Sequence, residues 1–193
     1  MSNITVFINL TLDGVMQGPA HADEDRRDGF ERGGWAAPYG AMQSSEAGAS
    51  LPGFDALLMG RRTYENFYGY WPHQTDSPFS EILNNMPKYV ASRTLRDPLP
   101  WVNTTLLKGD IAEAVGELKA QPGKNIVIMG SGELIQSLMQ HNLIDRYVLL
   151  IHPVVVGSGR RLFTDGGAFA SLQLIDAQKT PNGVVVATYQ PAR

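Results

Sequence analysis

The sequence predicts an α/β fold built on one central, mostly parallel sheet, with helices on its faces and a β-hairpin at its C-terminal end. Short apolar segments alternate with segments of helical periodicity along most of the chain, which is the pattern of β–α units around a parallel sheet. The segment 125–129 is nearly all apolar, which indicates a central strand buried on both faces. Pro181, Asn182 and Gly183 separate two strand-like segments and predict the turn of the hairpin. The sheet is therefore expected to be mixed rather than purely parallel.

Periodicity and turn signals place the individual elements. Alternation with a period of two places the first strand at 4–10, and Asp13-Gly14 ends it. The stretch 14–39 is rich in Gly, Asp and Arg without periodicity, which predicts a long loop of functional importance. Asp110 is expected to cap a helix at 111–120. Further strands are expected at 54–59, 88–92, 104–107, 125–129, 146–156, 171–179 and 184–190, and further helical segments at 41–51, 61–67, 79–85 and 133–141. One continuous sheet accounts for this order, so residues 1–193 are expected to form a single domain.

Composition excludes several classes of function. The formal net charge of −3 argues against a nucleic-acid-binding protein, which usually presents a basic face. The chain contains no cysteine, so it can form no disulfide, thiolate nucleophile or Cys-based zinc site, and its four histidines lack metal-ligand spacing. No apolar run reaches the roughly 18 residues that a membrane span needs. The apolar N-terminal stretch resembles a first strand rather than a signal peptide, so we expect a cytoplasmic protein without metal, membrane or nucleic-acid partners.

Two expected turns at the ends of strands carry arginine beside a hydroxyl group. Backbone N–H groups at a helix N-terminus attract anions, and a guanidinium offers phosphate a planar fork of donors. Such turns are therefore candidates for holding a phosphate-containing cofactor. The alternative is that the arginines are simply solvated and the second turn is an ordinary polar loop. The candidate residues are Gly60, Arg61, Arg62 and Thr63 in the first turn, and Ser92, Arg93 and Thr94 in the second.

A third turn is rich in glycine. Glycines let the backbone approach a pyrophosphate closely, and the following helix directs its N-terminus at that group. The spacing departs from the G-x-G-x-x-G fingerprint because residue 135 is Ile, so a standard Rossmann site is not indicated. Taken alone, the segment could be a tight turn. Its candidate cofactor-binding residues are Gly130, Ser131, Gly132, Glu133 and Leu134.

These segments together resemble the dihydrofolate-reductase-like superfamily, and most closely a stand-alone form of the RibD C-terminal domain, the reductase of bacterial riboflavin biosynthesis. The segment 9–14 is similar to the first strand and S-L-D-G signature of that family, and 59–64 to its G-R-x-T-aromatic motif. Ser92, Arg93 and Thr94 fall where the family contacts the 2′-phosphate of NADPH. The segment 128–157 is similar to the block G-x-x-x-L-x-x-x-L, L-[IV]-D-E and P-x-x-x-G, with Arg146 in place of the usual Glu.

The resemblance implies a single-domain dihydrofolate-reductase-like fold, NADPH as the cofactor and, often, a homodimer. It implies that hydride passes to a small heterocycle of pyrimidine or pterin type. The chain departs from RibD in lacking the cysteines of its zinc deaminase domain. Glu46 is the candidate for the acidic residue with which dihydrofolate reductase grips its pterin.

Three residues are candidates for contact with the substrate. Asp13 ends the first strand and could orient the substrate or donate a proton, or it could simply form the Asp-Gly turn. Asn9 lies among apolar neighbours, and its buried amide needs a partner from the substrate or from the backbone. Trp35, preceded by two glycines and followed by Tyr39, could form an aromatic lid over a planar ring, or it could pin the loop to the core.

Other polar and aromatic groups are expected to be structural. Arg160 and Arg161 are expected to be surface charges, and His152 a structural residue beside Pro153. The aromatic residues between 64 and 71 are expected to pack together.

The leading hypothesis is an NADPH-dependent reductase of a small heterocycle. The alternatives are a non-catalytic protein that binds a nucleotide or flavin-like ligand on the same fold, and a flavin reductase, for which the sequence offers no dedicated flavin site.

Overall fold

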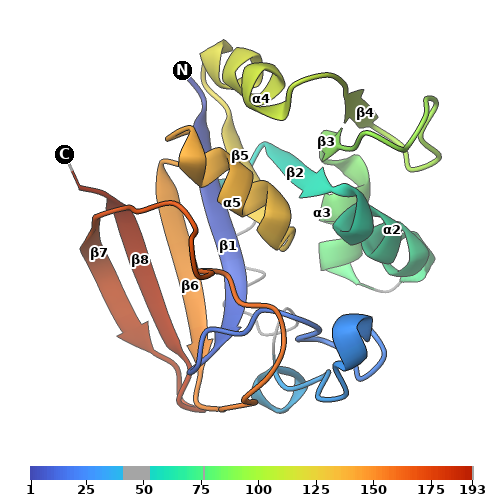
Figure 1. Cartoon of the computed structure of the whole chain (residues 1–193). Coiled ribbons are helices and arrows are strands. Elements are labelled where there is room, and N and C mark those ends of the chain that lie inside the picture. The colour runs from blue at the N-terminus through green and yellow to red at the C-terminus, as the bar shows by residue number, and fades with distance from the viewer. Residues whose placement is uncertain (41–52, 76, 193) are drawn as a thin grey trace.

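A computed structural model describes residues 1–40, 53–75 and 77–192, and the chain forms one eight-stranded sheet with helices on both faces (Figure 1). The strand order is β4-β3-β2-β5-β1-β6-β8-β7. The six strands from β4 to β6 run parallel, whereas β8 is antiparallel to both β6 and β7. The expected mixed, mostly parallel sheet with a C-terminal hairpin is therefore confirmed. The helix expected at 41–51, with Glu46, lies outside the described residues.

The strands lie close to their expected positions. The apolar segment 125–129 is β5, in the middle of the sheet between β2 and β1, which explains why it is apolar on both faces. The strands are β1 (Asn3–Thr11), β2 (Ala56–Gly60), β3 (Lys88–Ala91), β4 (Thr104–Leu107), β5 (Asn125–Met129), β6 (Arg146–His152), β7 (Leu172–Lys179) and β8 (Val185–Pro191).

The α-helices among the described residues are α2 (Arg61–Tyr70), α3 (Pro78–Asn85), α4 (Ile111–Ala120) and α5 (Gly132–Gln140). As expected, Asp110 caps α4, because its carboxylate accepts hydrogen bonds from the N–H groups of Ala112 and Glu113. None of these helices has the length and apolar character needed to cross a membrane.

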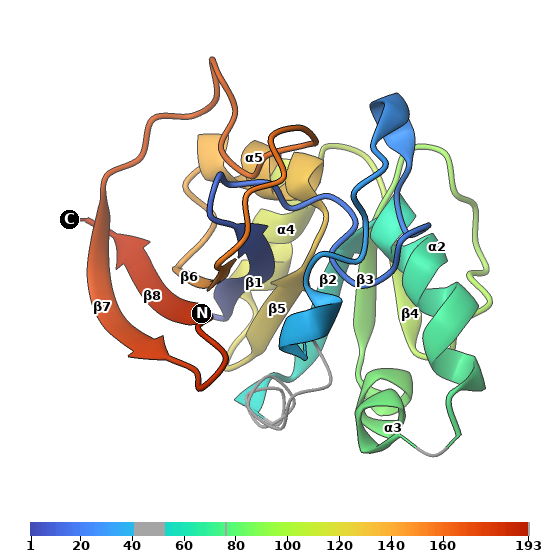
Figure 2. The same cartoon turned by 90° about the horizontal axis from the view of Figure 1, so that it is seen from below.

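Two apolar clusters cover the two faces of the sheet. One face of β1, with Ile4, Val6 and Ile8, packs against α4 and α5. The opposite face carries Phe7 and packs against the aromatic residues of α2 and the segment after it, as the sequence predicted. Figure 1 shows α5 across the near face of β1, and Figure 2 shows that β7 and β8 extend beyond the helices.

Two elements end three or more residues away from the expected position. The strand expected at 146–156 ends at His152, because Pro153 has no N–H to donate to a neighbouring strand. The helix expected at 61–67 continues to Tyr70, since the aromatic rings of Phe67 and Tyr70 pack on Trp71. The stretch 14–39 is a loop, as expected, with two short 3-10 turns at Arg27–Gly29 and Ala37–Tyr39.

Candidate functional site

The candidate site lies at the carboxyl ends of β2 and β5. These strands are neighbours in the sheet, yet the chain after β2 continues toward β3 on one side, and the chain after β5 continues toward β6 on the other. Their helices also pack on opposite faces, α2 through Tyr64 and α5 through Ile135. In open α/β sheets, the crevice at such a switch in direction is where ligands bind.

Ser131 joins the turns at the ends of these two strands. The backbone N–H of Gly60 donates to Ser131 Oγ at 2.8 Å, and the Ser131 hydroxyl donates to Thr63 Oγ1 at 2.7 Å. Ser131 has a φ of 68°, in the left-handed region that a residue other than glycine seldom adopts. The structure therefore brings together two of the three turns that the sequence singled out, with Ser131 as a structural link between them.

The N-termini of the two helices at this edge lack side-chain caps. No side-chain atom of Gly60, before α2, or of Ser131, before α5, accepts a hydrogen bond from the first turn of the helix. By contrast, Ser77 caps α3 and Asp110 caps α4, and both of these helices begin away from this crevice. The first N–H groups of α2 and α5 have no partner within their helices, and they form a place where an anion is favoured.

Arginine side chains surround this edge. Arg61 is half-buried and pairs with Glu65, with Nη1 and Oε1 3.2 Å apart. Arg62 and Arg93 are exposed and form no ion pair with any described residue. Basic residues in the first turn of a helix oppose its dipole, so Arg61 and Arg62 stabilise the fold better when an anion is bound there.

The second predicted turn, which contains Ser92, Arg93 and Thr94, follows β3, the strand next to β2. Gly60 pairs in register with Ala91, so Arg61 and Ser92 begin neighbouring turns. Ser92 Oγ accepts hydrogen bonds from the N–H groups of Thr94 and Leu95, at 3.2 and 3.0 Å. The serine hydroxyl therefore shapes this turn, while the side chains of Arg93 and Thr94 remain exposed at its surface.

Two residues of the glycine-rich turn have roles that the sequence did not show. The Leu134 side chain packs in the core beneath α5, so only its backbone N–H is available to a cofactor. Gly132 is in contact with Met16 from the long loop, since a Cβ on Gly132 would lie 1.8 Å from Met16 Cε. A side chain at position 132 would therefore have to displace the end of the Met16 side chain.

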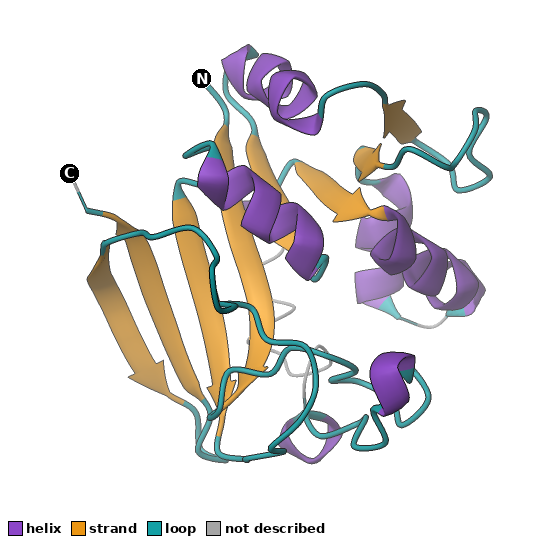
Figure 3. Cartoon of the chain, viewed as in Figure 1, coloured by secondary structure: helices purple, strands orange, loops and turns teal. Residues whose placement is uncertain are grey.

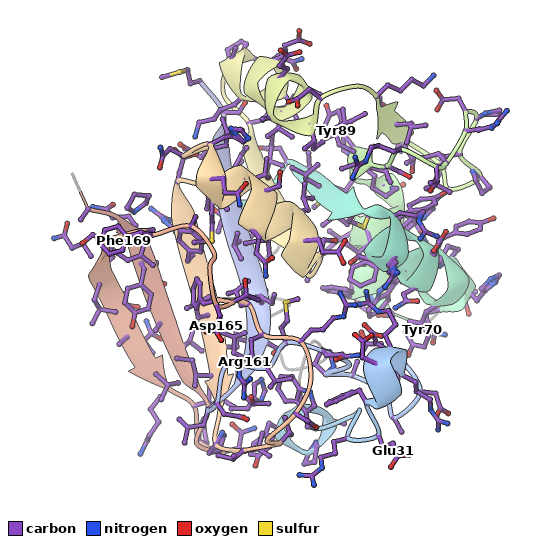
Figure 4. All side chains as sticks on the ribbon, viewed as in Figure 1. Glu31, Tyr70, Tyr89, Arg161, Asp165 and Phe169 are labelled. Atoms are coloured by element: carbon purple, nitrogen blue, oxygen red, sulfur yellow. The ribbon has the colours of Figure 1, made fainter. Side chains whose placement is uncertain are left out.

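The long loop is fastened across this edge by ion pairs. Arg160 Nη1 lies 3.0 Å from Glu133 Oε1, and Arg160 Nη2 lies 2.9 Å from Asp28 Oδ2. Arg161 Nε donates to the backbone oxygen of Asp13. The expectation that both arginines are simple surface charges is corrected, because each connects segments more than a hundred residues apart. Figure 3 shows the loop and the segment after β6 side by side, and Figure 4 labels Arg161 where they meet.

Asp13 is a structural residue in this arrangement. Its carboxylate accepts hydrogen bonds from the Thr11 hydroxyl at 2.6 Å and from the N–H groups of Val156 and Gly157 at 3.2 and 2.9 Å. The hydrogen bond from Thr11, followed by those from the backbone, lowers the pKa of Asp13 below its ordinary value. Asp13 is therefore ionised at neutral pH and poorly suited to the proton-donor role considered from the sequence.

Trp35 anchors the loop instead of offering a free aromatic face. Its indole N–H donates to the backbone oxygen of Gln17 at 2.8 Å, and its ring packs with Val15 and Phe30. In this conformation the structure thus favours the second of the two interpretations, in which Trp35 pins the loop to the core. Tyr39, four residues later, is only half-buried.

Asn9 has a side-chain partner that sequence reasoning missed. Its Oδ1 lies 2.9 Å from His152 Nε2, across the β1–β6 pair. The His152 ring is almost fully buried, with edge-on contacts to Trp35 and Tyr39 at 5.3 Å between ring centroids. Burial lowers the pKa of His152 to about 4, so its imidazole is neutral at physiological pH. The sequence signal was the pair of polar residues near the ends of two apolar strands.

No cluster of three or more His, Asp or Glu side chains in residues 1–40, 53–75 and 77–192 has the arrangement of a metal site.

Solved structures with this architecture come from riboflavin-biosynthesis and pyrimidine-reductase-like proteins. A protein of Shewanella sp. PV-4, described as a riboflavin biosynthesis protein, superimposes with a TM-score of 0.69 at 24% identity, over 100% of both chains. A pyrimidine reductase-like protein of Corynebacterium diphtheriae gives a TM-score of 0.67 at 16% identity, over 99% of this chain and 92% of the other. The fold is therefore that of the RibD-type reductase domain.

The sequence identifies the family itself. The family model of the RibD C-terminal domain matches residues 2–186, and the chain belongs to this family. A relative in Bacillus subtilis strain 168, the uncharacterized protein YyaP, is 31% identical over 139 residues, which cover 70% of this chain and 73% of YyaP.

Proposed function

We propose that this protein is an NADPH-dependent reductase that transfers hydride to a small heterocycle of pyrimidine or pterin type. The observation that carries the proposal is the β2–β5 switch point, where two helix N-termini without side-chain caps lie beside arginines. A dinucleotide carries three phosphate groups when it is NADPH, and this edge offers N–H donors and guanidinium groups to receive them. Membership of the RibD C-terminal domain family supports the same reaction class.

In this proposal, different residues of this edge bind different phosphate groups of NADPH. The first N–H groups of α2 and α5 would hold the pyrophosphate. Arg62 and Arg93 would hold the 2′-phosphate, aided by Arg61 once it leaves Glu65. NADPH supplies the hydride when bound, so the protein needs to position two rings and exclude water rather than provide a nucleophile.

Thermal unfolding tests the cofactor assignment. A ligand at about 100 times its Kd adds roughly 2.7 kcal/mol of stability, or a shift of about 5–10 °C for a chain of this size. We expect this shift with NADPH and a smaller one with NADH, because NADH lacks the 2′-phosphate. The double variant Arg61→Ala/Arg93→Ala should lose most of the NADPH shift. Arg146→Ala is the matched control, since Arg146 is exposed at the opposite end of β6. Equal shifts with both nucleotides would contradict the arginine assignment.

A non-catalytic protein that binds a nucleotide or flavin-like ligand is the second candidate function. It is favoured by the polar interactions that occupy Asp13, which leave that residue without a role in proton transfer. Transfer of label from NADPH deuterated at C4 to a panel of pyrimidines and pterins separates the two functions. Binding of NADPH without any transfer across the panel would favour the non-catalytic protein.

The homodimer implied by the family resemblance stays a prediction. Apolar side chains are exposed on β7, namely Leu174 and Ile175, and on the segments before it, where Phe169 is 96% exposed (Figure 4). Sedimentation velocity of the purified protein would distinguish monomer from dimer directly.

A further inference from the structure

One ring nitrogen of the buried His152 imidazole has no hydrogen-bond partner among the described residues. Its Nδ1 is the one buried side-chain nitrogen or oxygen that lacks a hydrogen-bond partner within the described residues. Folded proteins seldom leave a buried polar atom unpaired, and those that do often keep it for a ligand or a water molecule. His152 itself is only 1% exposed, so the unpaired atom does not face solvent in this structure.

The partner of the other ring nitrogen fixes the chemical character of Nδ1. Asn9 Oδ1 can only accept, so the hydrogen of the neutral imidazole lies on Nε2 and is donated to Asn9 at 2.9 Å. Nδ1 then carries a lone pair and is a hydrogen-bond acceptor. A suitable partner for it must present an N–H or O–H group.

The location of this pair connects it with the candidate site. Asn9 and His152 lie near the carboxyl ends of β1 and β6, and β1 is the next strand after β5. Because neighbouring strands are about 4.8 Å apart, β6 lies roughly 10 Å from β5, within the span of two rings placed side by side. Both residues face the same side of the sheet as Phe7 and Leu150.

The aromatic walls around His152 differ in how firmly they are held. Trp35 is buried and tied to Gln17 by its indole N–H. Tyr39 is half-buried and sits on a single 3-10 turn that ends in a left-handed Gly40. Of the two rings in contact with His152, that of Tyr39 is therefore the one that can move with the smaller rearrangement.

We propose that His152 Nδ1 accepts a hydrogen bond from a ring N–H of the substrate, with Asn9 holding the imidazole in the required tautomer. His152 thereby selects heterocycles that carry an imide or lactam N–H over N-alkylated analogues. Its role is in recognition, and it transfers no proton. The inference takes the kind of substrate from the proposed function. The residue that it concerns, His152, lies on β6, whereas the proposed cofactor site lies at the ends of β2, β3 and β5.

A pair of probes that differ only in N–H groups tests the inference. Lumazine has ring N–H groups, and 1,3-dimethyllumazine has none. In the presence of NADP⁺, which cannot donate hydride, we expect lumazine to bind the full chain about tenfold more tightly than the dimethyl compound. His152→Phe should remove this preference. In imidazole ¹⁵N spectra, the His152 resonances are assigned as those that disappear in that variant. The Nδ1 resonance should move to a chemical shift typical of a hydrogen-bonded acceptor when lumazine is added, but not when 1,3-dimethyllumazine is added.

A second variant guards against loss of folding. His152→Phe leaves the Asn9 oxygen unpaired, whereas Asn9→Leu/His152→Phe replaces both polar partners and is expected to fold better. The inference is overturned by equal binding of the two probes, by no binding of lumazine, or by an Nδ1 resonance that is already hydrogen-bonded without ligand, as a buried water would cause. NADPH-induced melting shifts, measured on the same proteins, tell whether the cofactor assignment stands or fails separately.

Discussion

The hydroxyl oxygen of Ser131 accepts a hydrogen bond from the backbone N–H of Gly60 at 2.8 Å, and thereby ties the end of β5 to the end of β2. The two residues are 71 positions apart in the chain and adjacent in the crevice. The same hydroxyl donates to Thr63 in the first turn of α2. One side chain thus sets the spacing between two helix N-termini, and any ligand that spans them depends on it.

Ser131→Ala tests this link. The variant leaves the Gly60 N–H without its partner and keeps the left-handed backbone, so we expect a loss of about 1 kcal/mol in the free energy of unfolding. NADPH affinity should fall about tenfold, because the two helix N-termini lose their fixed spacing. Urea denaturation and the NADPH melting shift measure the two effects. Ser137→Ala, within α5, is the control, and an unchanged NADPH affinity in Ser131→Ala would refute the role given to the link.

The buried imidazole of His152 predicts a pH dependence of stability. Its pKa is about 4 in the folded protein and 6.5 when solvated, so between these values the unfolded chain binds a proton that the folded protein does not. The free energy of unfolding should therefore decrease as the pH falls from about 6.5 to about 4, by roughly 3 kcal/mol in total.

Comparison with Asn9→Leu/His152→Phe isolates this contribution. Burial raises the pKa of Glu24, which acts with the opposite sign, but Glu24 is present in both proteins and cancels in the difference. Urea denaturation at a series of pH values between 4 and 7.5 gives the two curves. Parallel curves would show that His152 titrates in the folded protein as it does in solution.

Asp13→Asn tests the structural role of the Asp13 carboxylate. The variant loses the negative charge, and one carboxylate oxygen is replaced by an amide NH₂ group that faces the N–H groups of Val156 and Gly157. We therefore expect the free energy of unfolding to fall by about 2 kcal/mol at pH 7. Because the pKa of Asp13 is lowered on folding, its contribution is present above pH 3.8 and lost as the pH falls below that value. Urea denaturation at pH 7 and pH 3 should therefore show a smaller difference between variant and wild type at the lower pH. Asp165→Asn, on an exposed loop, is the control.

Lys88 supports the end of α3. Its Nζ donates to the backbone oxygens of Leu83, Asn84 and Met86 at 2.8, 3.1 and 2.7 Å. The charge lies 4.6 Å from the centre of the Trp101 ring, and burial lowers the pKa of the ammonium to about 8. Lys88→Met leaves these carbonyl groups unpaired and should cost about 2–3 kcal/mol. Equilibrium denaturation would measure the loss, with the exposed Lys179→Met as control. A loss no greater than that of the control would show that solvent or a shifted helix end replaces the lysine.

The parts of this fold that could be read from the sequence are those set by neighbouring residues. The alternation in β1, the apolar run of β5, the Asp110 cap and the hairpin turn each depend on a few adjacent positions, and each is confirmed. The end of β6 was missed although Pro153 marks it, since the apolar run continues to residue 156.

The parts that the sequence did not show depend on distant partners. The three candidate turns were identified separately, but the bond from Gly60 to Ser131 exists only because β2 and β5 pair. The contact of Asn9 with His152 spans 143 positions, and the ion pair of Arg160 with Asp28 spans 132. No local pattern encodes such contacts, because both partners have other possible neighbours until the strand order is known.

The strand order also has a consequence for how the protein is made. Residue 3 of β1 pairs with residue 125 of β5, and residue 5 of β1 pairs with residue 146 of β6, so β1 leaves the ribosome well before both of its neighbours. At about 5–20 residues per second, synthesis of the 141 residues from residue 5 to residue 146 takes roughly 7–28 seconds. During this interval, a strand that is buried on both faces in the folded protein has no sheet to join, which is the situation in which nascent chains associate with chaperones or with one another.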